Sequence, residues 1–365
     1  MSSAKLLRAL GAALLVVLGA SACGGGGGGS GGGSVVDTKL ACTEQFNPDK
    51  AAAGEDCKPT YGAFCPDTGS GSPIFNDSEV TACDGVTVSS GTVEANGLAS
   101  DYVVLKPANG SGDKALYIGL HWALANGDTM ANRMRMAELA KSRNVTVVLP
   151  TAPGSLLNRT WGRSAGIPPA ANRADRVALI DALIAQTKPL VSGSTPVLIA
   201  GVSGGAVLSF EYACDRAENI SGAIVVAGEI PPDDLSNCAM ARGVATVQVH
   251  GTSDLIGPYD GNLLYASVPD TFAALQTQNG CDSTAIKTAS LPTVDGELPT
   301  GYELQWVTAC STGKGSALLT VDGGGHNWPG YQGPLDQLPI SLFGAKASGF
   351  DTTLQGYDLV RYLGD

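Results

Sequence analysis

The sequence predicts an α/β protein with a mostly parallel central sheet and helices on both faces. Apolar runs of strand length alternate with helical patterns from about residue 115 onward, and 365 residues with 44% hydrophobic content can bury one large core. The runs expected to form strands lie at 115–120, 145–149, 197–200, 223–226, 244–249, 304–307 and 317–321. In such a sheet, functional sites form at the carboxyl ends of the strands.

The remaining elements follow from local patterns. Two strand-like segments at 86–88 and 102–105 flank Asn96-Gly97, a turn signal that predicts a hairpin. A helix is expected to begin near Pro269 and to end at Asn279-Gly280. Two further helices are predicted by apolar residues that share a face, namely Met130, Met134 and Ala137 in one and Val177, Ile180 and Ile184 in the other.

The first residues have the pattern of a secretory signal. Lys5 and Arg8 precede an apolar run at 9–18 that is too short to span a membrane, so 1–22 is interpreted as a signal peptide. The following Ala20-Ser-Ala-Cys23 resembles a bacterial lipobox, whose cysteine is lipidated. We therefore expect an exported protein, either a cell-surface lipoprotein anchored through Cys23 or, if Ala-x-Ala is cleaved without lipidation, a secreted one.

The cysteines support this interpretation. If Cys23 carries lipid, eight of the nine cysteines remain, and an even number in an exported protein suggests up to four disulfides. We expect Cys214 to pair with Cys238 and Cys281 with Cys310. The pairing of the others, Cys42, Cys57, Cys65 and Cys83, stays open.

The organisation then reads as a glycine-rich tether at 23–34, a disulfide-stapled extension at 35–83 and a catalytic domain at 84–365. A net charge of -12 and a pI near 4.6 argue against nucleic-acid binding. The chain has neither a phosphate-binding loop nor a dinucleotide fingerprint, and no Cys-x-x-Cys pair suggests a metal site. No cofactor is therefore expected.

Three stretches match Gly-x-Ser-x-Gly, and one of them has the context of a nucleophile elbow. Ser30 lies in the polyglycine run, and Ser164 has neither a strand before it nor a helix directly after it. Ser203 follows the apolar run at 197–200 and precedes a segment free of helix breakers. A strand, a tight turn and a helix in this order expose a serine hydroxyl, so Ser203 is the candidate nucleophile.

A serine nucleophile needs a base and an acid that orients it. Of the three histidines, His326 lies in a glycine-rich loop after a strand and is the candidate base, whereas His121 and His250 end strands and could be buried structural residues. Asp254, just past a strand end, is the candidate acid. Asp260 is the alternative, and Asp322 could serve a local turn. The order Ser203, Asp254, His326 is that of an α/β-hydrolase.

The tetrahedral intermediate of acyl transfer needs hydrogen-bond donors for its oxyanion. The backbone amide of Gly204 is the first candidate. The second is expected in the loop after 115–120, from Ala123 or Trp122. Trp122, Trp161 and Trp328 are candidate pocket residues.

At this point the chain resembles the secreted polyhydroxybutyrate depolymerase and feruloyl esterase group of the α/β-hydrolases over most of 84–365. His250-Gly-Thr-Ser-Asp254 resembles the acid loop of that group, and Gly323-Gly-Gly-His-Asn-Trp-Pro-Gly330 resembles its histidine loop. Cys281 and Cys310 are similar to a disulfide of the group. Two departures concern the site. Trp122 replaces the glycine of the usual Leu-His-Gly oxyanion segment, and the expected tryptophan-rich segment is reduced to Asn158-Arg-Thr-Trp161.

The resemblance implies a serine carboxylic-ester hydrolase that acts on polyester or hydroxyalkanoate oligomers. With the signal and lipobox pattern, we expect an exported protein, a monomer that contacts a membrane only through its lipid anchor. The alternative is a feruloyl or acetylxylan esterase on plant polysaccharide. A peptidase, an acyltransferase or a catalytically inactive surface-binding protein are the remaining hypotheses.

Overall fold

The computed structural model describes residues 37, 39–61, 79–110, 112–155, 157–164, 166–296, 300–330 and 347–365. Two compact units divide the chain after Ser34, and the described residues belong to the second, Val35–Asp365. The expected signal peptide, Cys23, the tether and Cys65 lie outside the described residues. Within them, no helix is long and apolar enough to cross a membrane.

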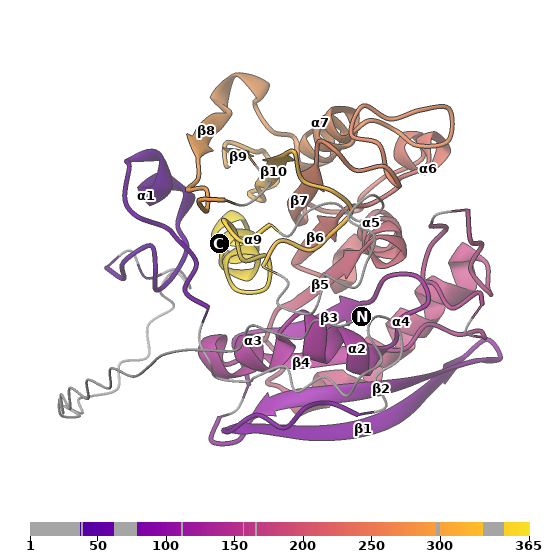
Figure 1. Ribbon diagram of the computed structural model, residues 1–365. Helices are drawn as coiled ribbons and strands as arrows, with labels where there is room; N and C mark the ends of the chain where they lie inside the picture. The colour runs from indigo at the N-terminus through magenta and orange to yellow at the C-terminus, as the bar shows by residue number, and fades with distance from the viewer. Residues whose placement is uncertain are drawn as a thin grey trace, which may run out of the picture. The chain divides into compact units, whose positions relative to one another are not determined.

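The described strands form one ten-stranded sheet in the order β1-β2-β4-β3-β5-β6-β7-β10-β9-β8 (Figure 1). The central strands from β4 to β10 pair in parallel, and β1, β2, β9 and β8 add antiparallel edges. This confirms the mostly parallel sheet expected from the sequence. The strands are β1 (Val86–Ala95), β2 (Leu98–Pro107), β3 (Leu116–Leu120), β4 (Thr146–Pro150), β5 (Val197–Val202), β6 (Gly222–Val226), β7 (Ala245–Gly251), β8 (Lys287–Ser290), β9 (Gly301–Val307) and β10 (Ser316–Asp322).

Side chains of the central strands alternate between two apolar layers. On β3, Tyr117 packs into the layer with α2, α3 and α9, whereas Leu116 and Ile118 pack into the layer with α4 and α5. Because both faces are covered, the central strands read as continuous apolar runs. The helices are α1 (Pro48–Ala52), α2 (Gly127–Arg133), α3 (Met136–Arg143), α4 (Arg173–Thr187), α5 (Gly204–Asp215), α6 (Pro232–Ser236), α7 (Val268–Asn279) and α9 (Gln355–Gly364). Short 3-10 turns occupy Lys188–Leu190, Ala217–Asn219 and Ser283–Ala285.

The local signals for the hairpin and for α7 are confirmed. Asn96 and Gly97 both have positive φ, at 50° and 76°, as the turn between β1 and β2 requires. Gly280 ends α7 with φ 62°.

The single helix expected around Met130, Met134 and Ala137 is wrong. Arg135 adopts φ 54° and divides it into α2 and α3. Its buried guanidinium pairs with Glu138 and with Asp351, 2.9 Å away, and these tertiary ion pairs favour the break.

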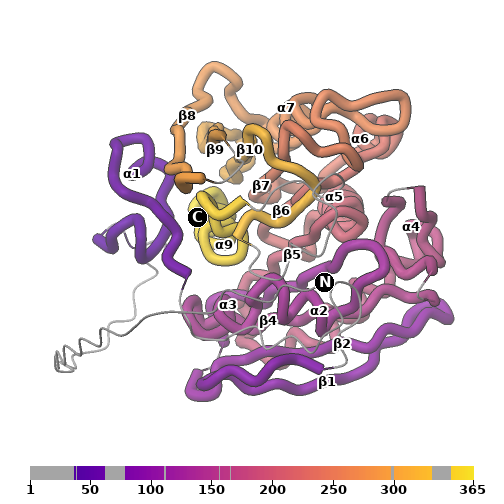
Figure 2. The backbone as a smooth tube through the Cα atoms, viewed as in Figure 1, coloured from indigo at the N-terminus to yellow at the C-terminus, as the bar shows by residue number. Residues whose placement is uncertain are grey.

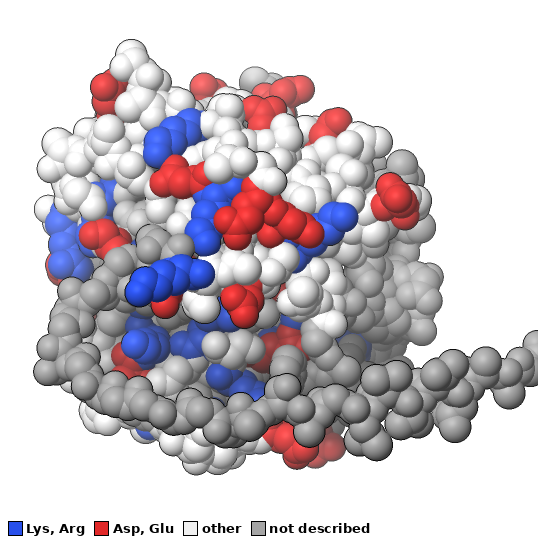
Figure 3. Space-filling view, turned by 90° about the vertical axis from the view of Figure 1, so that its left-hand side faces the viewer, with Lys and Arg blue, Asp and Glu red and all other residues white. Residues whose placement is uncertain are grey.

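The described residues 39–61 pack onto the rest of the unit, close to α9 and β8. Cys42 is bonded to Cys57, the Phe46 amide donates to Asp358 of α9, and the Phe46 and Phe350 rings meet edge to face at 5.5 Å. Figure 2 shows α1 beside β8, where Lys287 pairs with Asp49 of the extension. On the face that Figure 3 presents, Lys and Arg side chains lie among Asp and Glu rather than in a continuous basic patch.

The disulfides of the core join the expected partners. The structure pairs Cys214 with Cys238 and Cys281 with Cys310, and it also records Cys83 as disulfide-bonded.

Candidate active site

Ser203 lies in a strained turn between β5 and α5. Its φ of 56° and ψ of -123° are rare for a residue other than glycine. A Cβ at Gly201 would lie 2.2 Å from the Gly205 carbonyl, and a Cβ at Gly205 would lie 2.1 Å from the Leu120 carbonyl oxygen. Glycine is therefore required on both sides of the serine because the backbone of the turn packs against itself and against β3. These contacts are the physical reason for Gly-x-Ser-x-Gly at this position.

Asp254 follows β7 and accepts four hydrogen bonds. Oδ1 accepts from the Ile256 and Gly257 amides, each at 2.8 Å. Oδ2 accepts from His326 Nδ1 at 2.8 Å and from His250 Nε2 at 3.2 Å. Burial opposes the charge, but the hydrogen bonds from the two histidines hold the pKa of Asp254 well below its usual range. The carboxylate is therefore ionised and fixes the orientation of His326.

His326 lies in the loop after β10 with Nδ1 bonded to Asp254, which leaves the lone pair on Nε2 in the neutral ring. Burial alone would lower the pKa of His326. The Asp254 hydrogen bond and charge, together with the charge of Glu229, raise it. The histidine loop is held by a hydrogen bond from the Trp328 indole to Thr353, at 3.0 Å, and by one from the Gly330 amide to Ala347, at 2.7 Å.

The alternative acids lie elsewhere. Asp260 is exposed, and Asp322 is an exposed acceptor for Thr252 and Thr300 at 3.2 and 2.9 Å. The structure therefore brings Asp254, and neither alternative, onto His326.

The other two histidines have structural contacts. His121 Nδ1 donates to the Trp122 carbonyl at 2.6 Å, and Nε2 accepts from the Ala152 amide at 2.9 Å. Complete burial lowers the pKa of His121 to about 3, so the ring is neutral at ordinary pH. His250 is buried against Asp254, and its Nε2 donates to the Gly257 carbonyl at 2.7 Å. Both rings hold loops at the carboxyl edge of the sheet.

The expected oxyanion donors have amides that are not engaged elsewhere. Within the described part of the chain, neither the Ala123 nor the Gly204 amide makes a hydrogen bond. Leu124, with φ 71°, shapes the loop next to Ala123, and its amide donates to the Arg159 carbonyl at 2.7 Å.

The candidate pocket tryptophans differ in exposure. Trp161 is 0% exposed and its ring lies tilted by 53° to the His121 ring, and Trp328 is 1% exposed and hydrogen-bonded to Thr353. Trp122 is partly buried against the core. Trp122 therefore has the most surface to offer a ligand.

Sequence reasoning missed two residues beside the nucleophile. Ser164 Oγ lies 2.7 Å from Ser203 Oγ, and Glu229, in the turn after β6, lies 3.5 Å from Ser164 Oγ. Ser164 belongs to a Gly-x-Ser-x-Gly match that was set aside for lack of an elbow, and nothing in its local pattern indicates contact with Ser203. Glu229 has no sequence signal at all, because its burial at 1% exposure is a tertiary property.

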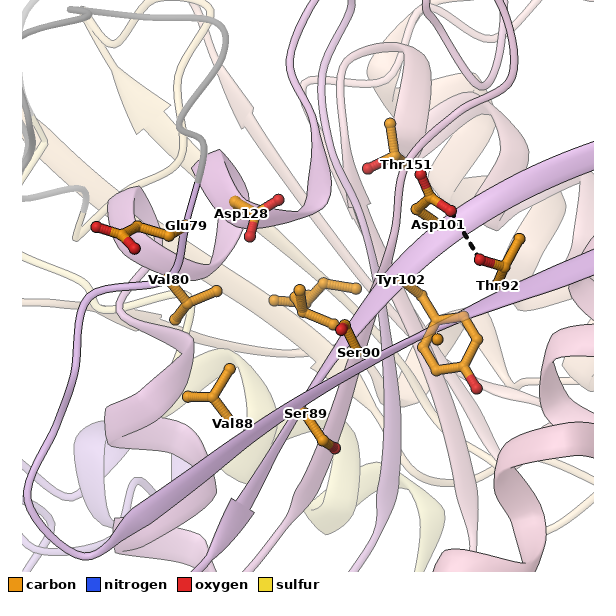
Figure 4. A pocket seen from close by; sticks show the side chains of 13 residues that line it. Glu79, Val80, Val88, Ser89, Ser90, Thr92, Asp101, Tyr102, Asp128 and Thr151 are labelled. Atoms are coloured by element: carbon orange, nitrogen blue, oxygen red, sulfur yellow. Dashed lines mark hydrogen bonds between the residues drawn. The ribbon is translucent and has the colours of Figure 1, made fainter.

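A cavity of about 520 Å³ lies apart from these residues, against β1 and β2 (Figure 4). Glu79 and Asp128 belong to its lining, and Asp101, also in the lining, accepts a hydrogen bond from Thr92 at 2.8 Å. Its lining includes neither a histidine nor a member of the Ser203 cluster, so it is not a candidate for acyl transfer.

No family model matches the chain. A probable feruloyl esterase C of Aspergillus oryzae is 31% identical over 192 residues, which are 51% of this chain and 64% of the relative. The corresponding protein of Aspergillus flavus is 32% identical over 187 residues, 50% of this chain and 62% of the relative. Over the matched residues, the chain is similar to the feruloyl esterases of these two fungi.

The match spans just under two thirds of the length of these two relatives. Among solved structures, an acetyl xylan esterase from Aspergillus awamori is 17% identical, with 70% of this chain and 99% of that chain covered and a TM-score of 0.46. The α/β-hydrolase fold expected from the sequence is confirmed by the sheet topology described above, with its elbow after β5.

Proposed function

We propose that this protein is an exported serine carboxylic-ester hydrolase that acts through an acyl-enzyme on hydroxycinnamoyl or acetyl esters of plant polysaccharide. The observation that carries the proposal is the buried hydrogen bond between Asp254 and His326, on the same sheet edge as Ser203 in its strained turn. An ionised acid, an oriented imidazole and a serine at an elbow are the parts that acyl transfer requires.

In the proposed reaction, Ser203 Oγ attacks the ester carbonyl while His326 Nε2 takes its proton. Asp254 stabilises the imidazolium that forms, and the Ala123 and Gly204 amides bind the oxyanion. When the tetrahedral intermediate collapses, the bond to the alcohol oxygen breaks and His326 returns the proton to the leaving alkoxide. Water then attacks the acyl-enzyme with His326 as the base, which restores Ser203 and releases the acid.

The relatives support the choice of substrate. Both are named as feruloyl esterases, so they favour the plant-ester alternative over polyhydroxybutyrate, which the sequence analysis put first. The loop after Asp254 also exposes Leu255, Leu263 and Leu264, at 71%, 99% and 68%. Leu255 directly follows the acid, and exposed apolar surface in this loop suits an aromatic or polymeric ester better than a small charged one.

The test uses Ser203→Ala, with Ser316→Ala as the matched control. Ser316 is a buried serine whose hydroxyl bonds Thr246 at the amino ends of β10 and β7, at the opposite edge of the sheet. We expect Ser203→Ala to lose hydrolysis of p-nitrophenyl acetate and covalent labelling by a fluorophosphonate, and Ser316→Ala to keep both. Hydrolysis or labelling that persists in folded Ser203→Ala overturns the proposal.

Substrate is tested on the wild type. We expect release of ferulate from methyl ferulate, or of acetate from acetylated xylan, to exceed release of 3-hydroxybutyrate from its oligomers. Faster release of 3-hydroxybutyrate would restore the polyester hypothesis. Hydrolysis of amide substrates at comparable rates would point to a peptidase instead.

A further inference from the structure

We propose that Ser164 is a further catalytic residue, whose hydroxyl donates a hydrogen bond to the nucleophile Ser203, and that the buried carboxylate of Glu229 beside Ser164 is the second acceptor for that hydrogen. The inference rests on the proposed function, because it concerns the same acyl-transfer site. It concerns a polar contact of the nucleophile that is separate from the proposed base.

The contact is built into the fold. Ser164 Oγ and Ser203 Oγ are 2.7 Å apart, and their residues are 1% and 3% exposed. A reciprocal pair of backbone hydrogen bonds with Ile167, at 3.2 and 2.7 Å, fixes the Ser164 backbone. The same segment lies against the start of α5, since a Cβ at Gly204 would lie 3.4 Å from Ser164 Cβ. The backbone pairing with Ile167 and the packing against α5 together fix the position of the Ser164 hydroxyl.

Two distances indicate which neighbour accepts the hydroxyl hydrogen of Ser164. A hydroxyl has one hydrogen to donate, and it has two neighbours, Ser203 Oγ at 2.7 Å and Glu229 Oε1 at 3.5 Å. The shorter distance is that of a full O–H···O hydrogen bond, whereas the longer one is at the limit. We therefore place the hydrogen toward Ser203, which leaves the hydrogen of Ser203 for His326.

This donor acts when charge develops on the nucleophile. As the Ser203 proton moves to His326 Nε2 and the Oγ–C bond forms, negative charge on Oγ strengthens the hydrogen bond from Ser164. In the acyl-enzyme, Oγ has become an ester oxygen and accepts more weakly, so the Ser164 hydrogen can turn toward Glu229. During deacylation the Oγ–C bond breaks, His326 returns a proton to Oγ, and the Ser164 contact forms again.

Glu229 is a second buried carboxylate, 1% exposed, and its charge acts on the histidine. Two carboxylates act on His326, namely Asp254 after β7 and Glu229 after β6. Asp254 also contacts His250, and Glu229 accepts a hydrogen bond from the Tyr265 hydroxyl. The positive charge of the exposed Arg163 acts to lower the pKa of Tyr265. Both carboxylates favour the imidazolium, so they raise the pKa of His326 against the effect of burial. Removing the charge of Glu229 must lower that pKa.

The two roles have different signatures in the pH profile of kcat/KM. The base must be neutral, so the acidic limb follows the pKa of His326. Ser164→Ala is expected to lower kcat/KM and the rate of fluorophosphonate inactivation by about 10- to 100-fold, the effect of one hydrogen bond to a charged group, with the limb unmoved. Glu229→Gln is expected to move the limb to lower pH.

The experiment measures these profiles for wild type, Ser164→Ala, Glu229→Gln and the control Ser316→Ala, with folding checked by circular dichroism. Ser164→Cys keeps the volume but is a weak donor, so it serves in place of Ser164→Ala if that variant does not fold, with the same expected direction. Wild-type inactivation rates in both Ser164 variants, or an unmoved limb in Glu229→Gln, overturn the inference. The proposed function fails separately, when Ser203→Ala stays active.

Discussion

Replacing Asp254 with asparagine should abolish most of the activity while leaving the fold intact. The structure shows why a change of one atom has this effect. Oδ1 accepts from two backbone amides, so the asparagine oxygen must take that side. The new amide group then faces His326 Nδ1 and His250 Nε2, at the 2.8 and 3.2 Å now spanned by hydrogen bonds to Oδ2.

Two donors cannot bond to one another, so His326 in this variant must expose an unprotonated Nδ1 to the amide and carry its proton on Nε2. That tautomer cannot accept the Ser203 proton. The wrong tautomer in a Ser-His-Asp triad costs about 10⁴-fold in kcat, which corresponds to about 5 kcal/mol of lost transition-state stabilisation. We expect a loss of about 10³- to 10⁴-fold here.

The assay is kcat for p-nitrophenyl acetate, measured beside the melting temperature. Asp260→Asn is the matched control, because Asp260 is exposed and is the nearest alternative acid. We expect Asp260→Asn to retain wild-type kcat. If Asp254→Asn retains a kcat within tenfold of wild type, or if Asp260→Asn causes the large loss instead, the assignment of the acid is refuted.

The remaining predictions concern the elbow and a buried histidine. Gly205→Ala should lower the free energy of unfolding by about 1–3 kcal/mol and reduce kcat, because its Cβ would lie 2.1 Å from the Leu120 carbonyl oxygen. Gly193 has open space around it, so the control Gly193→Ala should change neither quantity. Urea titrations measure the stability and ester hydrolysis measures kcat. For His121, the pKa of about 3 in the folded protein lies below the value of about 6.5 in the unfolded chain, so the unfolded chain binds the extra proton as the pH falls. The stability that the neutral His121 ring contributes is therefore fully present above pH 6.5 and is lost as the pH falls toward 3. Between pH 6.5 and 4, the wild type should lose stability at up to about 1.4 kcal/mol per pH unit more than His121→Gln, which does not titrate; equal slopes in the two proteins would contradict this.

Local sequence signals were sufficient to predict the strand, turn and helix that position Ser203. The elbow could be recognised from residues 201–205 and the apolar run before them, although the contact that requires Gly205 is made with Leu120 of β3. Asn96-Gly97 and Gly280 favour their own positive φ angles. The central strands were equally predictable, because helices cover both faces of the sheet and each such strand appears in the sequence as a continuous apolar run. The short exposed edge strand β8 was missed, because Lys287–Ser290 has neither an apolar run nor a clear alternation.

The break at Arg135 could not be predicted, because its partner Asp351 lies 216 residues further along the chain. The pairing of Asp254 with His326 could be expected only from the order of strand ends and from a family resemblance. The structure added the hydrogen bond itself and the second histidine on the same carboxylate.

By itself, the sequence determined the fold class, the elbow at Ser203 and the loops that carry Asp254 and His326, because each depends on patterns within a few residues. Only the tertiary structure decided what surrounds the nucleophile. Ser164 reaches Ser203 from 39 residues away in sequence and Glu229 reaches Ser164 from 65 residues away, and hydrogen bonds between such groups exist only after the fold has brought their loops together.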